Sequence, residues 1–333
     1  MAERAVSVEP FPGYSPAVEE CWMEMDGARM RYLRAGVVEK SPSPANPARS
    51  AALPGPSSRQ ESPSERNPPL ILLHGLLGYS FSWRYTMPAL APYATVYAPD
   101  MMGAGLSDRP RGIDHSMRGC AARLLRFVAG LGISKFDLLG TSHGGAVAMM
   151  AAAECLKAES RLRLRRLILV APVNPYSAHG RRLAPFVGNR LVAAVFRQTV
   201  PRMRFMFSYW HARMYGERGR IPPGTLEGYM APLAKAGLFD HALSIVRTWT
   251  SDLRDLQETL PKLASVPTLL MWGGEDVAVY ASSAPPLARC FPRSELIVYP
   301  GIGHLPYEEC AEEFNRDLIE FVTRDDPGRV PQS

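Results

Sequence analysis

The sequence predicts an α/β protein with a mostly parallel, doubly wound sheet and a helical cap inserted late in the sheet. Two observations predict this class. First, short apolar runs such as PLILLHG (69–75) and KFDLLGTS (135–142) alternate with segments of helical periodicity. Continuous apolar runs are typical of strands buried on both faces of a parallel sheet. Second, this alternation stops between about residues 175 and 264, where only helical patterns occur, and then returns.

The individual elements follow one another in a regular order. Residues 20–36 indicate two short strands around a turn at Asp26-Gly27. The stretch YSFSWRYTMPAL leads into a helix, and HSMRGCAARLLRFVAGLG has helical periodicity with a glycine stop. The remaining predicted strands are 69–75, 95–100, 135–142, 165–174, 267–276 and 295–304, and further helices follow Ser142 and span about Glu308 to Thr323.

One segment near the N-terminus differs sharply in composition. Between Val38 and Pro69, eight Pro and seven Ser occur in 32 positions, with few apolar residues. Such a segment cannot bury enough surface to offset its ordering entropy, so we expect a disordered insertion. The predicted organisation is an N-terminal segment with the first strands (1–37), the insertion (38–69), a first part of the core (70–174), the cap (175–264), a second part of the core (265–324) and a flexible tail (325–333).

Composition favours a globular protein with a substantial core and excludes several other classes. The chain has 333 residues, 46% hydrophobic and 21% charged, with a net charge of +6. The segment between Pro175 and Leu260 contains twelve Lys and Arg but only six Asp and Glu. We interpret this excess of positive charge as a solvated basic surface. No motif indicates nucleic-acid binding, and the longest apolar run, Ala146 to Leu156, is too short for an integral membrane segment.

Cysteine usage and the N-terminus bear on the cellular compartment. The five cysteines are scattered, odd in number, and form no CxxC or zinc-type spacing. The N-terminal residues contain no apolar stretch of the signal-peptide kind. Both features favour free thiols in a reducing compartment, so we expect a cytoplasmic location.

The stretch LLGTSHGGAV (138–147) contains the first candidate for chemistry. Ser142 lies between Gly140 and Gly144 where a predicted strand passes into a predicted helix. G-x-S-x-G at such a junction places a serine on a strained turn at the carboxyl edge of the sheet. A small residue in any tight strand-to-helix turn is the alternative interpretation. The motif alone therefore does not establish a nucleophile.

A serine nucleophile needs a base, and the base needs an orienting acid. His304 follows the predicted strand ELIVYPGIG, and Asp276 ends the preceding one, PTLLMWGGED. Taken singly, His304 could be a loop histidine and Asp276 a helix N-cap, and Glu275 is a second candidate for the acid. Ser142, Asp276 and His304 nevertheless all fall at carboxyl ends of predicted strands, in the order Ser, Asp, His. This agreement predicts a catalytic triad.

Acyl transfer also requires backbone N–H groups that stabilise the developing oxyanion, each worth about 3 kcal/mol. The bend at LLHGLLG offers the N–H of Leu76, and the helix start after the nucleophile offers the N–H of His143. The His143 side chain is too close in sequence to Ser142 to act as its base, but we expect that it could line the pocket.

On these motifs the sequence resembles the α/β-hydrolase superfamily, in its capped branch of serine hydrolases. The resemblance extends from about Glu20 to Val322 and rests on five motifs in order. These are HGLLG (74–78), DMMGAGLSD (100–108), GTSHGG (140–145), WGGED (272–276) and GIGH (301–304). The resemblance implies Ser142 as nucleophile, Asp276 and His304 as acid and base, and backbone oxyanion donors at Leu76 and His143.

The chain departs from parts of the superfamily in ways that bear on activity. Epoxide hydrolases and haloalkane dehalogenases of this fold carry Asp as nucleophile, whereas this chain has Ser142. GAGLSD lacks the third glycine of a dinucleotide fingerprint. We therefore expect no cofactor and no metal, and a small-molecule substrate as the partner. The oligomeric state is not predicted.

The predicted function is hydrolysis of a carboxylic ester or similar acyl bond of a small, largely apolar substrate through an acyl-enzyme. The cap stretch RMRFMFSYWHARMYG (202–216) is rich in aromatic residues and Met. We expect most of these side chains to form the cap's core and some to line the pocket. Alternatives are hydrolysis of a carbon–carbon bond in a ring-cleavage product, perhydrolase or haloperoxidase-like activity, and, from another class, a non-catalytic ligand-binding protein.

Overall fold

The computed structural model describes residues 18–36, 67–177, 204–235 and 237–324. Residues 38–66 of the predicted insertion, residues 178–203 of the predicted cap and the predicted tail at 325–333 lie outside the described residues.

An eight-stranded sheet forms the centre of the described structure, in the order β1-β2-β4-β3-β5-β6-β7-β8. β1 and β2 are antiparallel, β2 and β4 are antiparallel, and all other pairs are parallel. The predicted mostly parallel sheet is therefore confirmed, including the hairpin at Asp26-Gly27. The strands are β1 (Glu19–Met25), β2 (Ala28–Ala35), β3 (Leu70–Leu73), β4 (Val96–Pro99), β5 (Lys135–Thr141), β6 (Arg163–Val170), β7 (Thr268–Gly273) and β8 (Ser294–Tyr299).

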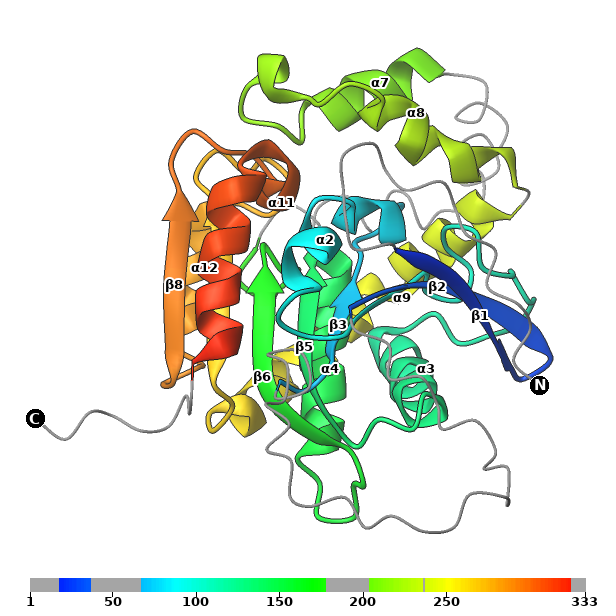
Figure 1. The fold of residues 1–333 in the computed structure, drawn as a ribbon, viewed down its shortest axis with the longest axis vertical. Helices are drawn as coiled ribbons and strands as arrows, with labels where there is room; N and C mark the ends of the chain where they lie inside the picture. The colour runs from blue at the N-terminus through cyan, green and yellow to red at the C-terminus, as the bar shows by residue number, and fades with distance from the viewer. Residues whose placement is uncertain (1–17, 37–66, 178–203, 236, 325–333) are drawn as a thin grey trace, which may run out of the picture.

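Helices cover both faces of this sheet (Figure 1). The α-helices are α2 (Thr86–Leu90), α3 (Met117–Gly130), α4 (Ser142–Cys155), α7 (Arg204–Ala212), α8 (Thr225–Met230), α9 (Leu238–Thr259), α10 (Ala284–Ala288), α11 (Pro306–Glu309) and α12 (Ala311–Thr323). Short 3₁₀ helices are η1 (Ser80–Trp83), η3 (Arg218–Arg220), η4 (Ala231–Ala234), η5 (Leu260–Leu263) and η6 (Ala281–Ser283).

The period-two alternation of the strands divides the core into two clusters, one on each face. In β3, Ile71 and Leu73 pack with α3, α4 and the second half of α9. Leu70 and Leu72 point the other way and pack with α2 and α12. Every residue of β3 is buried, because both faces of the strand are covered. This double coverage explains why the strands read as continuous apolar runs.

α4 is the helix that the nucleophile motif opens, and it lies deep in the core. Eleven of its 14 residues are buried, so it is apolar on nearly all sides rather than on one stripe. Met149 and Met150 pack internally in this core. A helix held this firmly gives its first residue, Ser142, a fixed place relative to the sheet.

The residues between β6 and β7 form a separate helical layer, which we call the insert (described residues 204–235 and 237–263). Figure 1 shows α7 and α8 beyond the end toward which β6 and β8 point. α9 returns from this layer, and its second half joins the core through Leu253 and Leu256. The insert therefore covers the carboxyl edge of the sheet, where functional residues gather in open α/β folds.

The C-terminal helix predicted at 308–323 is two helices, α11 and α12. The chain leaves helical geometry at Cys310, with φ −132° and ψ 52°. The hydrophobic pattern continues across this break, so periodicity alone does not reveal it. Within the described residues, no helix is both long and apolar enough to cross a membrane.

Candidate active site

Ser142 occupies a strained turn between β5 and α4. Its φ is +52°, in the left-handed region that non-glycine residues rarely adopt. Such a conformation costs about 1–3 kcal/mol and persists only where its surroundings enforce it. Part of that enforcement is close backbone packing, since a Cβ at Gly144 would lie 2.3 Å from the carbonyl oxygen of His74. The turn after Ser142 is thus pressed against the HGLLG loop.

His304 and Asp276 meet across the ends of β7 and β8. His304 Nδ1 lies 2.7 Å from Asp276 Oδ2, and both side chains are buried. Because an ionised carboxylate can only accept a hydrogen bond, Nδ1 is the donor in this contact. Nε2 is therefore the ring nitrogen that can take a proton from another group. This is the arrangement that a general base requires.

The second oxygen of Asp276 is also used. Asp276 Oδ1 accepts from the backbone N–H groups of Ala278 and Val279, both at 2.8 Å. These two bonds hold a turn rather than a helix start, because residues 277–280 are not helical and the next helix, η6, has Tyr280 as its N-cap. The interpretation of Asp276 as a helix N-cap is therefore wrong, and its contact with His304 is the one that an orienting acid would make. The competing carboxylate, Glu275, is exposed.

Ser142 and His304 line one cavity of about 340 Å³ between the core and the insert. No hydrogen bond joins their side chains among the described contacts, as is common before a substrate is bound. The other lining residues are mainly apolar and aromatic: Gly75, Leu76, Leu77, Gly78, Ser82, Phe207, Trp210, His211, Met214, Tyr229, Phe239, Leu305 and Tyr307.

The aromatic stretch of the insert divides between this cavity and solvent. Phe207, Trp210 and Met214 line the cavity. Phe205 and Tyr209 on α7 are 69% and 49% exposed, so the prediction that most of these side chains form a cap core is wrong for them. The reason is that α7 lies on the outside of the molecule and can bury only one face. Met203 lies outside the described residues.

The loop that carries Leu76 is held by a side chain that sequence reasoning did not use. The ring of His74 is buried, and its Nε2 accepts from the N–H of Met101 at 2.9 Å. Its Nδ1 therefore carries the proton, and it lies 2.8 Å from the carbonyl oxygen of Gly75. Since a trans peptide directs its C=O and N–H to opposite sides, fixing Gly75 C=O also fixes the direction of Leu76 N–H. In the sequence, the pair His74-Gly75 within HGLLG was the feature that could have indicated this role of His74.

The His143 side chain does not line the described cavity, contrary to the expectation from sequence. It is buried beneath the turn and stacks on Trp249, with ring centroids 6.2 Å apart. Neither ring nitrogen has a hydrogen-bond partner among the described residues. The physical reason is that residue 143 lies in the first turn of the buried helix α4, so its side chain points into the core.

The burial of His143 predicts a loss of stability in acid. Burial, reinforced by His74 and His115, lowers its pKa to about 3, and the pKa of His241 is also well below normal, chiefly through burial. An unfolded histidine binds a proton near pH 6.5, so between pH 6.5 and 3 the unfolded state binds more protons than the folded state. For His143 this removes about 2 kcal/mol between pH 7 and 5.

Urea denaturation at pH 7 and pH 5 measures this effect. In His143→Phe, which keeps the stack on Trp249 but cannot titrate, the free energy of unfolding is expected to fall less over this range than in the wild type. Equal pH dependence in the two proteins would show that His143 does not contribute to the acid lability.

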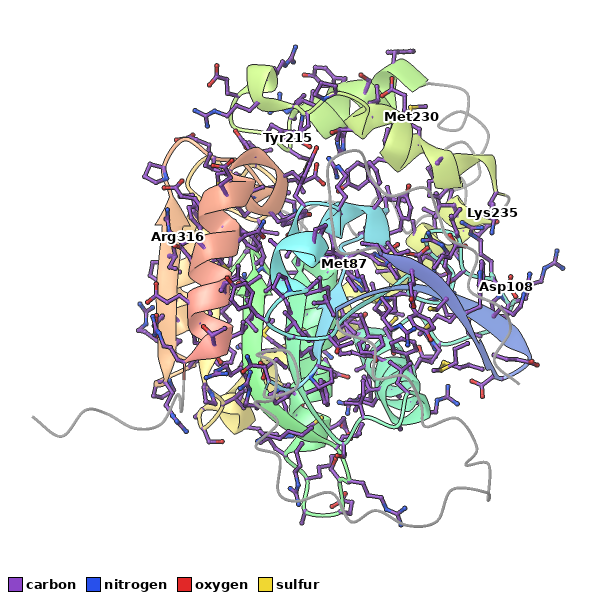
Figure 2. All side chains as sticks on the ribbon, viewed as in Figure 1. Met87, Asp108, Tyr215, Met230, Lys235 and Arg316 are labelled. Atoms are coloured by element: carbon purple, nitrogen blue, oxygen red, sulfur yellow. The ribbon has the colours of Figure 1, made fainter. Side chains whose placement is uncertain are left out.

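A buried ion pair lies beside the cavity and links the core to the insert. Arg84 donates two hydrogen bonds of 2.8 Å to the two oxygens of Glu308, whose side chain is fully buried. Tyr215 donates to the same carboxylate at 2.6 Å, and Tyr229 also donates to it. Figure 2 shows Tyr215 where the upper helices meet the core.

The carboxylate of Glu308 sets the protonation of its neighbours. Burial opposes the charge of Arg84, but the hydrogen bonds and charge of Glu308 outweigh burial and raise the pKa of Arg84. Burial and the charge of Glu308 raise the pKa of Tyr229, so its phenol stays a donor. The positive charge of the Arg84 guanidinium beside the cavity is therefore already balanced by the carboxylate of Glu308.

Among the described residues, no three His, Cys, Asp or Glu side chains gather as metal ligands would.

Comparison with known proteins agrees with this fold. The family model for the alpha/beta hydrolase fold matches residues 68–311. The chain is 27% identical over 266 residues to haloalkane dehalogenase 2 of Mycobacterium tuberculosis, covering 76% of this chain and 87% of that protein. It is 26% identical over 273 residues to 2-hydroxy-6-oxo-2,4-heptadienoate hydrolase of Pseudomonas putida, covering 78% and 90%.

Among solved structures, the epoxide hydrolase CorEH superposes with a TM-score of 0.69 at 21% identity, covering 91% of this chain and 98% of that chain. The family match extends over most of the chain, and the sheet order and helical layers agree with it. The protein belongs to the alpha/beta hydrolase fold family and is an enzyme of that class.

Proposed function

We propose that this protein is a serine hydrolase that cleaves a carboxylic ester or similar acyl bond of a small, uncharged, largely apolar substrate. One observation carries the proposal. The strained Ser142 and the His304–Asp276 pair, with Nδ1 and Oδ2 2.7 Å apart, come from separate strand ends to one cavity. Ser142 in place of an aspartate nucleophile separates this chemistry from that named for the dehalogenase and epoxide hydrolase relatives.

The proposed reaction follows from the roles that these groups can fill. Ser142 Oγ attacks the substrate carbonyl while His304 Nε2 takes its proton, and Asp276 stabilises the resulting imidazolium. Negative charge then develops on the former carbonyl oxygen, where the N–H groups of Leu76 and His143 are the proposed donors. The tetrahedral intermediate collapses, and the alcohol leaves with the proton from His304. A water, deprotonated by His304, attacks the acyl-enzyme and releases the acid.

The lack of cationic side chains among the described cavity residues favours a neutral ester over the anionic substrate of a carbon–carbon bond hydrolase. The heptadienoate hydrolase relative acts, by its name, on a carboxylate anion. No Lys or Arg is among the described residues that line the cavity of this chain. Arg84 lies behind this wall, but Glu308 already pairs with it in two hydrogen bonds. Among the described lining residues, a buried carboxylate of a substrate would find no Lys or Arg as a counterion, and an unpaired charge is costly in a water-poor site.

We also propose that the predicted cap, residues 175–264, shields the acyl-enzyme from bulk water.

We propose a cytoplasmic location as well. This proposal rests on the odd number and scattered positions of the cysteines, and all five are free thiols in the structure. Perhydrolase activity uses the same triad with peroxide as the second nucleophile, and it is tested by adding peroxide and a carboxylic acid.

A substrate panel tests the proposed function. Neutral aryl esters of graded acyl length are compared with a vinylogous diketone that carries a carboxylate, using the wild type and Ser142→Ala. We expect turnover of the esters with an optimum at short to medium acyl length, because the cavity of about 340 Å³ is small. The Ser142→Ala protein is expected to be inactive on all of them.

The panel also separates the alternatives. Turnover of the diketone alone would replace the esterase proposal by carbon–carbon bond hydrolysis. Saturable binding of these compounds without turnover, in a wild type that retains its fold, would support a non-catalytic binding protein.

A further inference from the structure

The loop that carries His304 is in direct backbone contact with the insert. His304 N–H donates to the carbonyl oxygen of Met214 at 2.6 Å. The approach is so close that a Cβ at Gly303 would lie 2.3 Å from that same oxygen. Arg220 donates to the carbonyl oxygen of Gly301 at 3.0 Å. The position of the proposed base therefore depends on the segment that follows α7.

One carboxylate joins the two segments at this contact. The side chain of Glu309 is fully buried, at the end of α11. Its Oε2 accepts from Gly303 N–H at 2.7 Å and from Gly216 N–H at 2.9 Å. Its Oε1 accepts one hydrogen bond from Glu217 N–H at 3.1 Å and another from the guanidinium of Arg220 at 3.4 Å. Three backbone donors from two segments thus converge on one side chain.

We infer that Glu309 is a positioning residue for His304, acting through the backbone of Gly303 and through the insert. The inference rests on the role of His304 as base under the proposed function. Hydrogen bonds from N–H groups to a carboxylate are about twice as strong as those to a neutral acceptor. Glu309 therefore fixes the residue directly before His304 and holds the segment Met214–Glu217 against it.

The neighbouring Glu308 does not share this role. Its carboxylate faces Arg84, Tyr215 and Tyr229, whereas all the donors to Glu309 are backbone N–H groups and Arg220. An acceptor with two oxygens is needed at position 309. In Glu309→Gln, one oxygen becomes an NH₂ group that faces the backbone donors. Glu309→Asp keeps both oxygens but shortens the side chain.

Covalent labelling of Ser142 tests the inference, because it reports activation of the nucleophile without a chosen substrate. The rate constant for reaction with a fluorophosphonate is measured for the wild type, Glu309→Asp, Glu309→Gln and the control Glu312→Gln. Glu312 is exposed on the next helix. Urea denaturation gives the folded fraction of each protein, and rates are expressed per folded molecule.

We expect Glu312→Gln to react like the wild type, Glu309→Asp more slowly, and Glu309→Gln about tenfold more slowly or worse, since displacement of a reacting group by 1 Å costs about 10²-fold. Wild-type reactivity in Glu309→Gln would overturn the inference. So would a loss that disappears once the rate is divided by the folded fraction, because that pattern describes stability rather than positioning.

A second measurement separates failure of the inference from failure of the proposed function. The Nδ1 proton that His304 shares with Asp276 is followed by NMR and assigned by its absence in His304→Ala. We expect it in the wild type and in Glu312→Gln and expect it broadened or lost in Glu309→Gln. If the wild type does not label but this pattern holds, the nucleophile is wrong and the inference stands. Absence of the signal in the wild type, or its persistence in Glu309→Gln, would overturn the inference.

Discussion

Replacing Asp276 by Asn is expected to lower kcat by about 10⁴-fold while the protein stays folded. The amide is nearly isosteric, so Oδ1 can keep its hydrogen bonds to Ala278 and Val279, each 2.8 Å in the wild type. At the other position, the 2.7 Å contact to His304 Nδ1 loses its charged acceptor, and an NH₂ group facing the ring favours the tautomer with the proton on Nε2. That tautomer cannot accept the proton of Ser142. Steady-state kinetics on an ester that the wild type turns over measures the effect.

Glu275→Gln is a matched control for this prediction. It removes the adjacent carboxylate, which is exposed, and the structure gives its side chain no contact with His304. We expect near wild-type kcat for Glu275→Gln. Equal losses in the two variants would show that a general change of charge at the end of β7 lowers activity, and the assignment of Asp276 as the orienting acid would fail.

Replacing Glu308 by Gln is expected to destabilise the protein by about 3–5 kcal/mol, because it leaves the buried guanidinium of Arg84 without a counterion. The side chains of Arg84 and Glu308 are 6% and 0% exposed, so water cannot replace the lost charge. The substitution also weakens the hydrogen bonds from Tyr215 and Tyr229, which connect the insert to the core. Urea denaturation at pH 7 measures the change in the free energy of unfolding.

Two further variants show whether the charge itself is responsible. Glu312→Gln removes a carboxylate from the exposed surface of α12 and is expected to change stability by less than about 0.5 kcal/mol. The double variant Arg84→Met with Glu308→Leu removes both charges and is expected to recover much of the loss. A small effect of Glu308→Gln, below about 1 kcal/mol, would show that Arg84 finds another partner or reaches solvent.

The fold could be predicted from the sequence because the strands are buried on both faces. LILL in β3 and LILV in β6 carry no polar residue, and only a sheet covered on both sides buries such runs completely. The predicted α/β class, the mostly parallel sheet and the family are confirmed. The break at Cys310 could not be predicted, because a change of backbone angle leaves the apolar pattern unaltered.

The candidate site could be predicted only where a residue type suited to catalysis lies at the carboxyl end of a predicted strand. Ser142, Asp276 and His304 each lie at the carboxyl end of a predicted strand, which can be recognised from the sequence alone. Glu309 contacts backbone groups of residues brought near it by folding, and nothing in its sequence neighbourhood indicates those partners. His74 is next to Gly75 in sequence, but the N–H of Met101, which donates to its other ring nitrogen, comes from a separate loop. The direction of the His143 side chain had no signal either, because it depends on the orientation of α4 in the core.

The central claim, an activated nucleophile at Ser142, is tested most directly by intact-mass analysis after exposure to a fluorophosphonate. The wild type and Ser142→Ala are treated side by side, and far-UV circular dichroism establishes that both are folded. We predict one adduct on the wild type and none on Ser142→Ala. No adduct on the folded wild type, or an adduct on both proteins, would contradict the claim.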